Sequence, residues 1–439
     1  MVEDVHPLDP AAAPPADGFV ARLTANPWVR SVAQTASTRV AILLVGLAST
    51  VVLARALGPT GRGLFAVAVT TGTLLVVLGN FGFHAVNTYY GAREPDRVGQ
   101  LVFNSVALTG AVAATAAAGG LAVSRLWPHL LPVHGAMAVL VACWVPIGLL
   151  FTQLQPLVLV AGKVRAFNLS DVVSQLGAVA LIVALWGAGV LTPAWAYAAT
   201  LAATGAAVGL IVRSIRHSIT AGSRPSRALL RRTFPYALRS YVTSVTLLLL
   251  LRLDILLVQG YLGERQVGLY TVATTIGEVA QLVPATIGTL LFPRLSSVAD
   301  ADERWRVLRR VTAVTAGIML VLCVAIAVFA RIGVRIVYGH AFLPSVPSIY
   351  WLVPGFFFLG LNAVLLNYFL AVRMPPAIVA CQAGAVVLNV VLDVVLLPRH
   401  GIVGASLAST IAYACLFVAI ASYALRTRGR HVAAAAAEP

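Results

Sequence analysis

The sequence predicts an all-α protein that crosses a membrane about twelve times, as two pseudo-symmetric lobes of six helices each. Of its 439 residues, 59% are hydrophobic and only 10% are charged, and the mean hydropathy is +0.91. A water-soluble protein needs roughly 25% charged residues, so lipid must be part of the solvent of this chain. Twelve apolar stretches can each cross the ~30 Å hydrocarbon core as a helix, and none alternates like a strand of a β-barrel. They lie near 40–56, 64–88, 101–123, 136–161, 169–190, 192–212, 236–259, 268–292, 311–330, 348–371, 376–397 and 402–425.

The distribution of Lys and Arg predicts that both ends of the chain lie in the cytoplasm. With the N-terminus inside, the inner loops and tails hold 23 of the 31 basic residues, whereas Arg252 lies within a span. The seven assigned to outer loops are Arg55, Arg62, Arg125, Arg265, Arg331, Arg335 and Arg399. This asymmetry satisfies the positive-inside rule for an even number of spans. Because the net charge of +16 is spread over many loops, it does not indicate a nucleic-acid partner.

Changes in composition divide the chain into two lobes with a linker and two tails. The linker is basic and the N-terminal tail is rich in proline, which predicts that this tail is disordered or lies at the membrane interface. The expected segments are a cytoplasmic tail (1–37), an N-lobe (38–212), a basic cytoplasmic linker (213–235), a C-lobe (236–425) and a second cytoplasmic tail (426–439). Residues 300–310 are expected to form a short interfacial helix on the inner side.

Two internal matches at nearly the same offset predict that the lobes are copies of one unit. Residues 57–68 read LGPTGRGLFAVA and residues 262–273 read LGERQVGLYTVA, at an offset of 205. Residues 175–183 read QLGAVALIV and residues 382–390 read QAGAVVLNV, at an offset of 207. Because six spans is an even number, the copies would share one orientation in the membrane. Transporters with such repeats bind substrate between their halves.

Polar side chains recur at helical spacing inside several spans. The stripes are Thr73, Asn80, His84 and Asn87 in the second span, Thr271, Thr274, Glu278 and Gln281 in the eighth, and Gln382, Asn389 and Asp393 in the eleventh. Spacings of three, four and seven place each set on one helical face. A polar face toward lipid would be costly, so each stripe faces either a central cavity or a neighbouring helix that it bonds.

Three charged residues in the seventh and eighth spans are candidates for function, because a charge within a span costs ~2.5 kcal/mol or more. Arg252 and Asp254 are two residues apart and therefore point in different directions; Asp254 is expected to support a neighbouring helix. Glu278 lies about 15 Å into its span, near the midplane, and Arg252 lies closer to the outer side. The Glu278 carboxylate must be protonated, paired with an arginine or bound to a cation.

No motif for catalysis or for a tightly bound cofactor is present in the sequence. It contains no phosphate-binding glycine loop with a lysine, no zinc signature and no domain between spans large enough for catalysis. Its four cysteines lie within spans and form no cluster of metal ligands. We therefore expect no enzyme, no metal site and no cofactor, with energy supplied by substrate flux or by coupling to H⁺ or Na⁺.

Several longer patterns resemble a known family. They are ARALGPTGRGLFAVA, RLDILLVQGYLGERQVGLYTVA, LVPATIGTLLFPRLS, VYGHAF and LNVVLDVVLLPRHGIVGASLAST. From about Thr38 to Tyr423, the chain resembles the polysaccharide-biosynthesis flippases of the multidrug/oligosaccharidyl-lipid/polysaccharide (MOP) exporter superfamily. The resemblance implies a MATE-like pair of six-helix lobes in a V, with helices 1, 2, 7 and 8 lining the central cavity.

The resemblance also implies a substrate, a mechanism and a location. Such flippases move a polyprenyl-pyrophosphate-linked oligosaccharide, a precursor of surface polysaccharide, to the outer leaflet of the bacterial cytoplasmic membrane by alternating access. A diphosphate needs cations, and hydroxyl or amide groups would meet the sugars. The candidate substrate contacts are Arg252, Arg39, Arg55, Asn80, His84, Asn87, Thr274 and Gln281, with Glu278 for coupling and Asp254, Gln382, Asn389 and Asp393 as supporting residues. The implied partners are membrane lipids, glycosyltransferases and a polymerase.

Two other functions stay open on the sequence. The first is a cation-coupled multidrug exporter of the same fold, with Glu278 as the coupling carboxylate; Arg252 would disfavour cationic drugs. The second is a membrane scaffold for glycan assembly that transports nothing. The paired polar stripes argue against the scaffold, because a scaffold needs no water-filled cleft.

Overall fold

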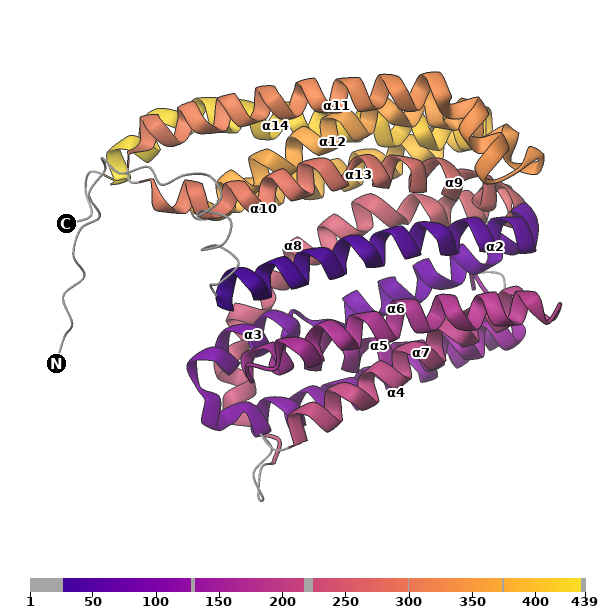
Figure 1. The fold of residues 1–439 in the computed structure, drawn as a ribbon, viewed down its shortest axis with the longest axis horizontal. Coiled ribbons are helices and arrows are strands. Elements are labelled where there is room, and N and C mark those ends of the chain that lie inside the picture. The colour runs from indigo at the N-terminus through magenta and orange to yellow at the C-terminus, as the bar shows by residue number, and fades with distance from the viewer. Residues whose placement is uncertain (1–26, 128–130, 217–223, 299, 373–374, 436–439) are drawn as a thin grey trace.

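The computed structural model describes residues 27–127, 131–216, 224–298, 300–372 and 375–435, and these residues form helices and turns without a strand. The N-lobe contains α2 (Pro27–Asn80), α3 (Phe83–Arg93), the 3-10 turn η1 (Pro95–Arg97), α4 (Val98–Leu126), α5 (Gly135–Val160), α6 (Val164–Gly187) and α7 (Pro193–Ile215). The C-lobe contains α8 (Arg227–Leu262), α9 (Glu264–Ala280), α10 (Leu282–Ser297), α11 (Ala301–Val337), η4 (His340–Ser345), α12 (Val346–Val372), α13 (Pro376–His400) and α14 (Ile402–Ala435). Figure 1 shows the two lobes side by side.

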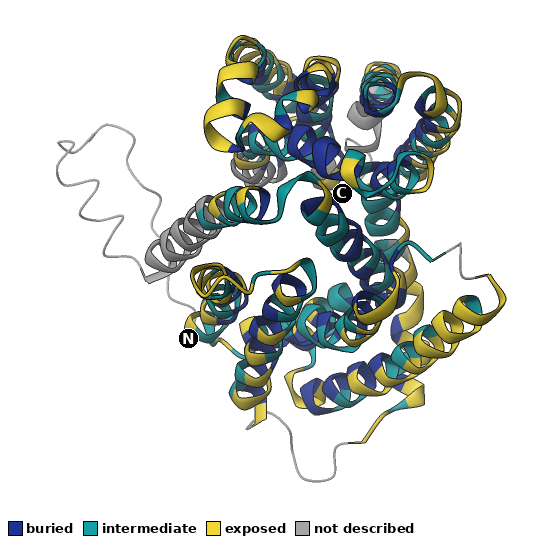
Figure 2. Ribbon diagram, turned by 90° about the vertical axis from the view of Figure 1, so that its right-hand side faces the viewer, coloured by how far each residue is buried: buried dark blue, intermediate teal, exposed yellow. Residues whose placement is uncertain are grey.

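The expected twelve spans are confirmed, although two of them do not form single continuous helices. Ten helical segments of the described chain are long and apolar enough to cross a membrane. One of them, α2, contains two expected spans because it folds back at Gly58, and the expected eighth span is divided into α9 and α10 at Gln281. Many large apolar side chains are exposed on the outside of the bundle, where lipid would cover them (Figure 2).

Equivalent glycines form the turns between the first two helices of each lobe. Gly58 has φ 65° and ψ −177°, and Gly263, which is 205 residues later, has φ 81° and ψ 175°. This backbone region is accessible almost only to glycine, because the Cβ atom of any other residue would clash with the backbone there. The same glycine turn recurs at the repeat offset, which supports the pseudo-symmetry that the sequence predicted.

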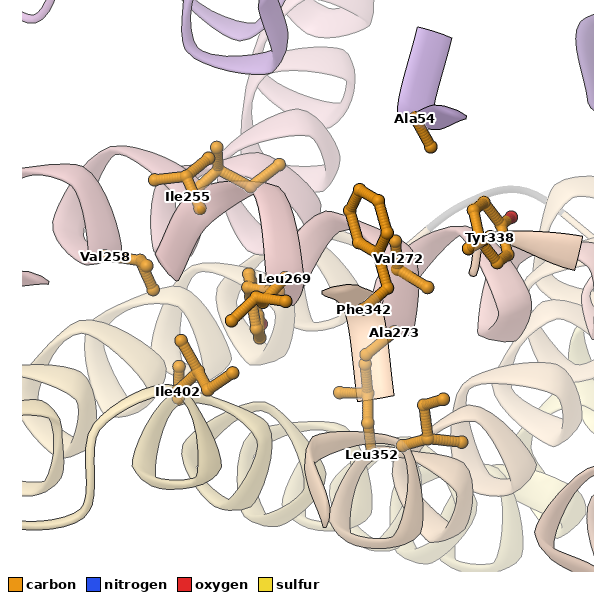
Figure 3. Close-up of a cluster of buried hydrophobic side chains, with 14 of the residues drawn as sticks. Ala54, Ile255, Val258, Leu269, Val272, Ala273, Tyr338, Phe342, Leu352 and Ile402 are labelled. Carbon is orange, nitrogen blue, oxygen red and sulfur yellow. The ribbon is translucent and has the colours of Figure 1, made fainter. Parts of the chain in front are cut away.

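The lobes meet at one end of the molecule. We call the end at which α2 begins and α14 ends the tail side, and the end with the Gly58 and Gly263 turns the far side. The largest hydrophobic cluster draws residues from both lobes, including Ala54 and Val67 of α2 and Leu269 and Val272 of α9 (Figure 3). The cluster around Leu365 of α12 belongs to the C-lobe alone. The lobes are therefore closed against each other on the far side. Toward the tail side, α10 diverges from α2 (Figure 1), while the first half of α8 packs against the N-lobe.

Two glycines make the far-side closure as tight as two helices allow. A Cβ atom built on Gly63 of α2 would overlap the backbone oxygen of Glu264, and one built on Gly268 of α9 would overlap that of Pro59. The two overlaps are reciprocal, because Pro59 and Glu264, like Gly63 and Gly268, are separated by the repeat offset of 205. The pseudo-two-fold axis thus passes between α2 and α9, and small residues permit backbone contact there.

The structure corrects the expected ends of some elements. The separate interfacial helix expected at 300–310 is wrong, since these residues form the first turns of the continuous helix α11. Helix α14 continues to Ala435, into the segment expected to be a tail, whereas residues 1–26 of the N-terminal tail lie outside the described residues. Helix α8 begins within the expected linker, and its Leu229 and Ala237 are buried in an N-lobe cluster.

We expect Gly63→Ala to open the far side. The added methyl group must push α9 away, and overpacking of this kind costs about 1–3 kcal/mol. Spin labels at Trp195→Cys and His400→Cys, in a background without the four native cysteines, would report the distance between the lobes, which should increase. Gly46→Ala on the same helix is the control, because its new Cβ would meet no atom within 4 Å. An unchanged distance distribution in Gly63→Ala would contradict this role of the crossing.

Candidate functional site

A polar cavity of about 210 Å³ lies between the lobes, directly inside the far-side closure. Its lining residues come from both arms of α2 and from α8 and α9: Thr50, Leu53, Arg62, Phe65, Ala66, Val69, Thr70, Arg252, Ile255, Thr271, Thr274, Thr275 and Glu278. These are helices 1, 2, 7 and 8 in span order, as the family resemblance implied. The cavity thus contains five threonine hydroxyls, two guanidinium groups and one carboxylate.

Arg62 is the most buried charged group of the cavity, and the sequence analysis placed it wrongly in an outer loop. Its side chain is 5% exposed. It donates to the backbone oxygen of Thr50 (3.1 Å) on the first arm of α2, and to the backbone oxygen of Thr271 (3.4 Å) and the hydroxyl of Thr275 (3.3 Å) on α9. Arg62 therefore bonds the N-lobe to the C-lobe at the inner surface of the closure.

Aromatic rings complete the environment of Arg62. The guanidinium carbon lies 5.1 Å from the ring centre of Tyr338 and 5.9 Å from that of Phe342, both in the C-lobe. Carbonyl oxygens and ring faces stabilise a cation without cancelling its charge. None of these contacts is a carboxylate, so the positive charge of Arg62 remains available to an anion in the cavity.

Arg252 and Glu278 form an ion pair across α8 and α9. The Nη1 atom of Arg252 lies 3.0 Å from an Oε atom of Glu278, and the two side chains are 36% and 43% exposed. The sequence placed the two residues at different depths, and the structure shows that their side chains are in contact. Of the three states that the sequence allowed for Glu278, the structure shows the arginine pair. The pair faces the cavity and is partly open to it, so an incoming anion can reach Arg252.

A second polar cluster lies behind the cavity, inside the C-lobe. Asp254 is 2% exposed and accepts hydrogen bonds from the Ile255 amide (2.8 Å) and the Tyr270 hydroxyl. The Tyr270 and Ser409 hydroxyl oxygens are 3.5 Å apart, and Asn389 donates to Ser409 (3.4 Å).

Asp393 lies one turn after Asn389 on α13 and has no exposed surface. Neither of its carboxylate oxygens has a hydrogen-bond partner among the described residues. Gln382, on the same face of α13, is also buried. A buried carboxylate without a donor is unstable as a bare anion, so it must take up a proton or a cation.

The remaining predicted contacts of the eighth and second spans are divided between the cavity and the lobe interiors. Thr274 lines the cavity, whereas Gln281 donates to the backbone oxygen of Phe356 (2.7 Å) and ties the α9–α10 break to α12. Asn80 and His84 bond each other (2.7 Å) across the α2–α3 break. Asn87 is fully buried in the N-lobe, where it donates to Ser105 and to the backbone of Gln153.

Of the two other predicted arginines, Arg55 is not among the described residues that line the cavity. Arg55 is exposed on the far side and donates to the backbone oxygens of Val337 (2.9 Å) and Ile336, at the end of α11. It satisfies carbonyl groups that the last turn of a helix leaves without partners. The side chain of Arg39 lies outside the described residues.

A signal for Arg62 was nevertheless present in the sequence. The predicted polar stripe of the second span begins at Thr73, and Arg62 lies eleven residues earlier, which is three helical turns on the same face. The cavity-lining residues of this arm confirm that face, at positions 62, 65, 66, 69 and 70. The extension of the stripe to Arg62 was missed because the LGPTGR sequence resembles a polar loop by its composition. In the structure the helix resumes directly after Gly58.

The two lobes and the cavity between them place the chain in the class of polytopic membrane proteins with the MOP transporter fold. One solved structure of this fold is the inward-facing conformation of a multidrug resistance MATE family transporter of the MOP superfamily, which is 14% identical with a TM-score of 0.71 over 91% of this chain and 96% of that chain. Another is the lipid II flippase MurJ in the inward closed conformation, which is 13% identical with a TM-score of 0.69 over 92% of this chain and 90% of that chain.

The chain belongs to the polysaccharide biosynthesis protein family, whose model matches residues 29–299, more than half of the sequence. This confirms the resemblance seen in the sequence. A curated relative is the probable low-salt glycan biosynthesis flippase Agl15 of Haloferax volcanii, which is 26% identical over 207 residues. The match covers 46% of this chain and 44% of the relative, so it spans less than half of that protein.

We expect Arg62→Gln to weaken the far-side closure. The variant loses charged hydrogen bonds to Thr271 and Thr275, each of which contributes about 1.5–3 kcal/mol. Thermal unfolding in detergent and the labelling rate of a cysteine placed at Ala66 in the cavity wall, with a reagent added from the far side, would measure the change. Arg125→Gln is the control, because this exposed arginine of α4 makes the same change of charge and has no bond to the C-lobe among the described residues. If Arg62→Gln labels no faster than Arg125→Gln, Arg62 does not hold the closure.

Proposed function

We propose that this protein is a flippase that moves a polyprenyl-pyrophosphate-linked oligosaccharide across the cytoplasmic membrane by alternating access. The observation that carries the proposal is the pair of guanidinium groups, Arg62 from the N-lobe and Arg252 from the C-lobe, in one cavity between the lobes. The family and the glycan flippase relative support the substrate class. The reaction is transport and breaks no covalent bond.

The charge of the cavity suits a phosphate-bearing headgroup. Two arginines and one glutamate leave one net positive charge, and none of the other lining residues is ionisable. Guanidinium groups bind phosphate oxygens through two parallel hydrogen bonds. At about 210 Å³, the closed cavity is smaller than the roughly 300 Å³ or more of a pocket for a drug-sized ligand. It therefore fits the diphosphate, while the sugars occupy the space between the lobes toward the tail side and the polyprenyl chain stays in lipid.

Substrate binding can open the far side by competition for hydrogen bonds. The N–H groups of Arg62 that hold α9 are the same donors that a phosphate would take. Phosphate oxygens are stronger acceptors than the neutral oxygens of Thr271 and Thr275, so the headgroup replaces the bonds between the lobes. A phosphate beside Arg252 likewise replaces Glu278. The closure then rests on the apolar cluster, the glycine crossing and the exposed bonds of Arg55 to α11, and the lobes can rock apart on the far side.

The direction of transport follows from the sidedness of the chain. The excess of Lys and Arg on the tail side supports a cytoplasmic position for that side. Helix α10 diverges from α2 toward the tail side in this structure, so the cavity accepts substrate made in the cytoplasm. Opening of the far side would then release the glycan to the outer leaflet. Glycosyltransferases and a polymerase are the partners that would make and use the transported glycan.

The alternative functions fit the cavity less well. A cation-coupled multidrug exporter would need a free carboxylate for its cationic substrate, but Glu278 is occupied by Arg252 and the cavity is net positive. A scaffold without transport would not need two cations in a cavity that both lobes share. The cavity thus favours an anionic substrate over both alternatives.

We expect Arg252→Ala to abolish export of the lipid-linked glycan while the protein stays folded and inserted. Deletion of the gene in its host, complemented with each variant, allows surface glycan and the accumulated lipid-linked precursor on the cytoplasmic face to be measured together. Arg265→Ala is the matched control, because this exposed arginine lies on α9 outside the cavity. Normal export by the folded Arg252→Ala variant would refute the anion site, and altered drug susceptibility with intact glycan would favour the exporter.

The buried C-lobe cluster is the stronger candidate for ion coupling. Glu278 is already neutralised by Arg252, whereas Asp393 is completely buried and neither of its carboxylate oxygens has a donor among the described residues. Asp393, Asn389, Ser409 and Asp254 supply oxygen atoms of the kind that H⁺ or Na⁺ would need. Tyr270 links this cluster to α9, two turns before Glu278, so ion binding there can act on the wall of the cavity.

We expect Asp393→Asn to remove the dependence of transport on a H⁺ or Na⁺ gradient. Uptake of a fluorescent polyprenyl-linked glycan into proteoliposomes, with each gradient imposed separately, would identify the ion. Glu278→Gln is the control, since it makes the same carboxylate-to-amide change within the cavity and should keep the dependence. If Asp393→Asn responds to both gradients like the native protein, coupling does not involve this cluster.

A further inference from the structure

A groove of about 640 Å³ lies on the surface of the C-lobe, away from the central cavity. Its walls are formed by α11, α12 and α14, none of which contributes to the cavity between the lobes. The lining is apolar apart from three arginines and one threonine: Trp305, Arg306, Leu308, Arg309, Arg310, Thr312, Ala313, Ala316, Leu365, Phe417, Ala421, Ala424 and Leu425.

The three arginines of the groove are charged side chains for which the described residues supply no partner. Arg306, Arg309 and Arg310 are exposed, and within the described residues they make no hydrogen bond, ion pair or ring contact. Their spacing of three and four residues places them on one face of α11. Three like charges on one face repel each other, and an anion bound among them would relieve this repulsion.

The position of the groove is the boundary between hydrocarbon and water on the tail side. Figure 1 shows α11 beginning beside the end of α14 on that side. Trp305 is 7% exposed, and its ring lies edge-on against Tyr368 of α12, with 6.5 Å between the ring centres. The stretch 311–330, which follows Arg310 directly, carries no charge and is long enough to cross the hydrocarbon core. The three arginines are therefore expected at the depth of lipid phosphates, and the apolar part of the groove at the depth of acyl chains.

We propose that this groove is a binding site for an anionic phospholipid of the cytoplasmic leaflet. The phosphate lies among Arg306, Arg309 and Arg310, and an acyl chain lies in the groove against Leu365 and Phe417. Basic pockets between membrane helices on the cytoplasmic side bind anionic headgroups, and each arginine near such a surface raises affinity by roughly five-fold. The site is separate from the flippase cavity and does not depend on the function proposed for it.

Two features select this groove and this occupant. A neighbouring groove of about 780 Å³ between α10 and α11 shares Arg306 and Arg310, but its lining includes the carboxylate of Glu303, which would repel an anion. A soluble phosphate would leave the apolar walls against water or lipid tails without a specific contact. A phospholipid satisfies the arginines and the apolar walls together.

The test is lipid binding by the purified full-length chain, measured by native mass spectrometry and by thermal unfolding. Phosphatidylglycerol should bind and raise the unfolding temperature, whereas phosphatidylcholine should not. The triple variant Arg306→Gln, Arg309→Gln and Arg310→Gln should lose affinity for phosphatidylglycerol on the order of a hundredfold. The control variant Arg224→Gln, Arg227→Gln and Arg231→Gln makes the same charge change among exposed tail-side arginines outside the groove, and it should bind normally.

A second variant and two further probes distinguish the sources of phosphate. Ala316→Phe and Ala421→Phe fill the groove but keep the arginines, so they should also reduce binding of phosphatidylglycerol. Glycerol phosphate, which has no acyl chain, should not stabilise the protein. Equal stabilisation by glycerol phosphate, preferential binding of polyprenyl phosphate, or unchanged lipid binding by the arginine variant would each overturn the proposal.

Discussion

Two glycines, Gly63 on α2 and Gly268 on α9, allow the lobes to touch backbone to backbone on the far side. The divergence of α10 from α2 toward the tail side, the position of the cavity and the contacts of Arg62 all depend on this approach. A side chain at either glycine would hold the helices apart, and Arg62 could then no longer reach Thr271 and Thr275. Because the crossing lies on the pseudo-two-fold axis, duplication of a single six-helix unit supplies both halves of the contact.

The cavity combines a barrier and a binding site in the same side chains. Arg62 contributes to the closure through neutral oxygens and aromatic rings, and it keeps a positive charge that an anion can approach. Arg252 is held by Glu278 in a pair that is partly open to the cavity. In the proposed mechanism, closure and substrate binding use the same donors, which provides a physical link between occupancy and opening. The buried carboxylates of Asp254 and Asp393 add a separate site on the other face of α8, where an ion could act without entering the cavity.

The sequence predicted the class and architecture of the protein well. Composition required a membrane, the apolar stretches gave the twelve spans, and the repeat at an offset of 205 gave the two lobes and the equivalence of Gly58 with Gly263. It predicted parts of the site less well. Arg252 and Glu278 were identified because they interrupt apolar runs, but their contact was missed because the depth of two helices in the membrane depends on where each begins. Asn87 was expected to meet sugar, yet a helical stripe does not say whether the helix turns it toward a cavity or toward a neighbour.

The sequence alone thus determined that this chain is a duplicated membrane protein. Hydropathy, charge asymmetry and repetition can all be read along the chain, and the first two follow directly from how residues interact with lipid. Only the tertiary structure decided which polar residues share a cavity. Arg62 follows a glycine and a proline that look like a loop, and it becomes a cavity residue because Gly58 turns the helix back within one residue. The oxygens of Asp393, for which the described residues supply no donor, and the three arginines beside the C-lobe groove are likewise visible only once α8, α11, α13 and α14 lie in place. The burial of a side chain and its hydrogen-bond partners depend on helices that are distant in the chain, so a local sequence pattern cannot predict them.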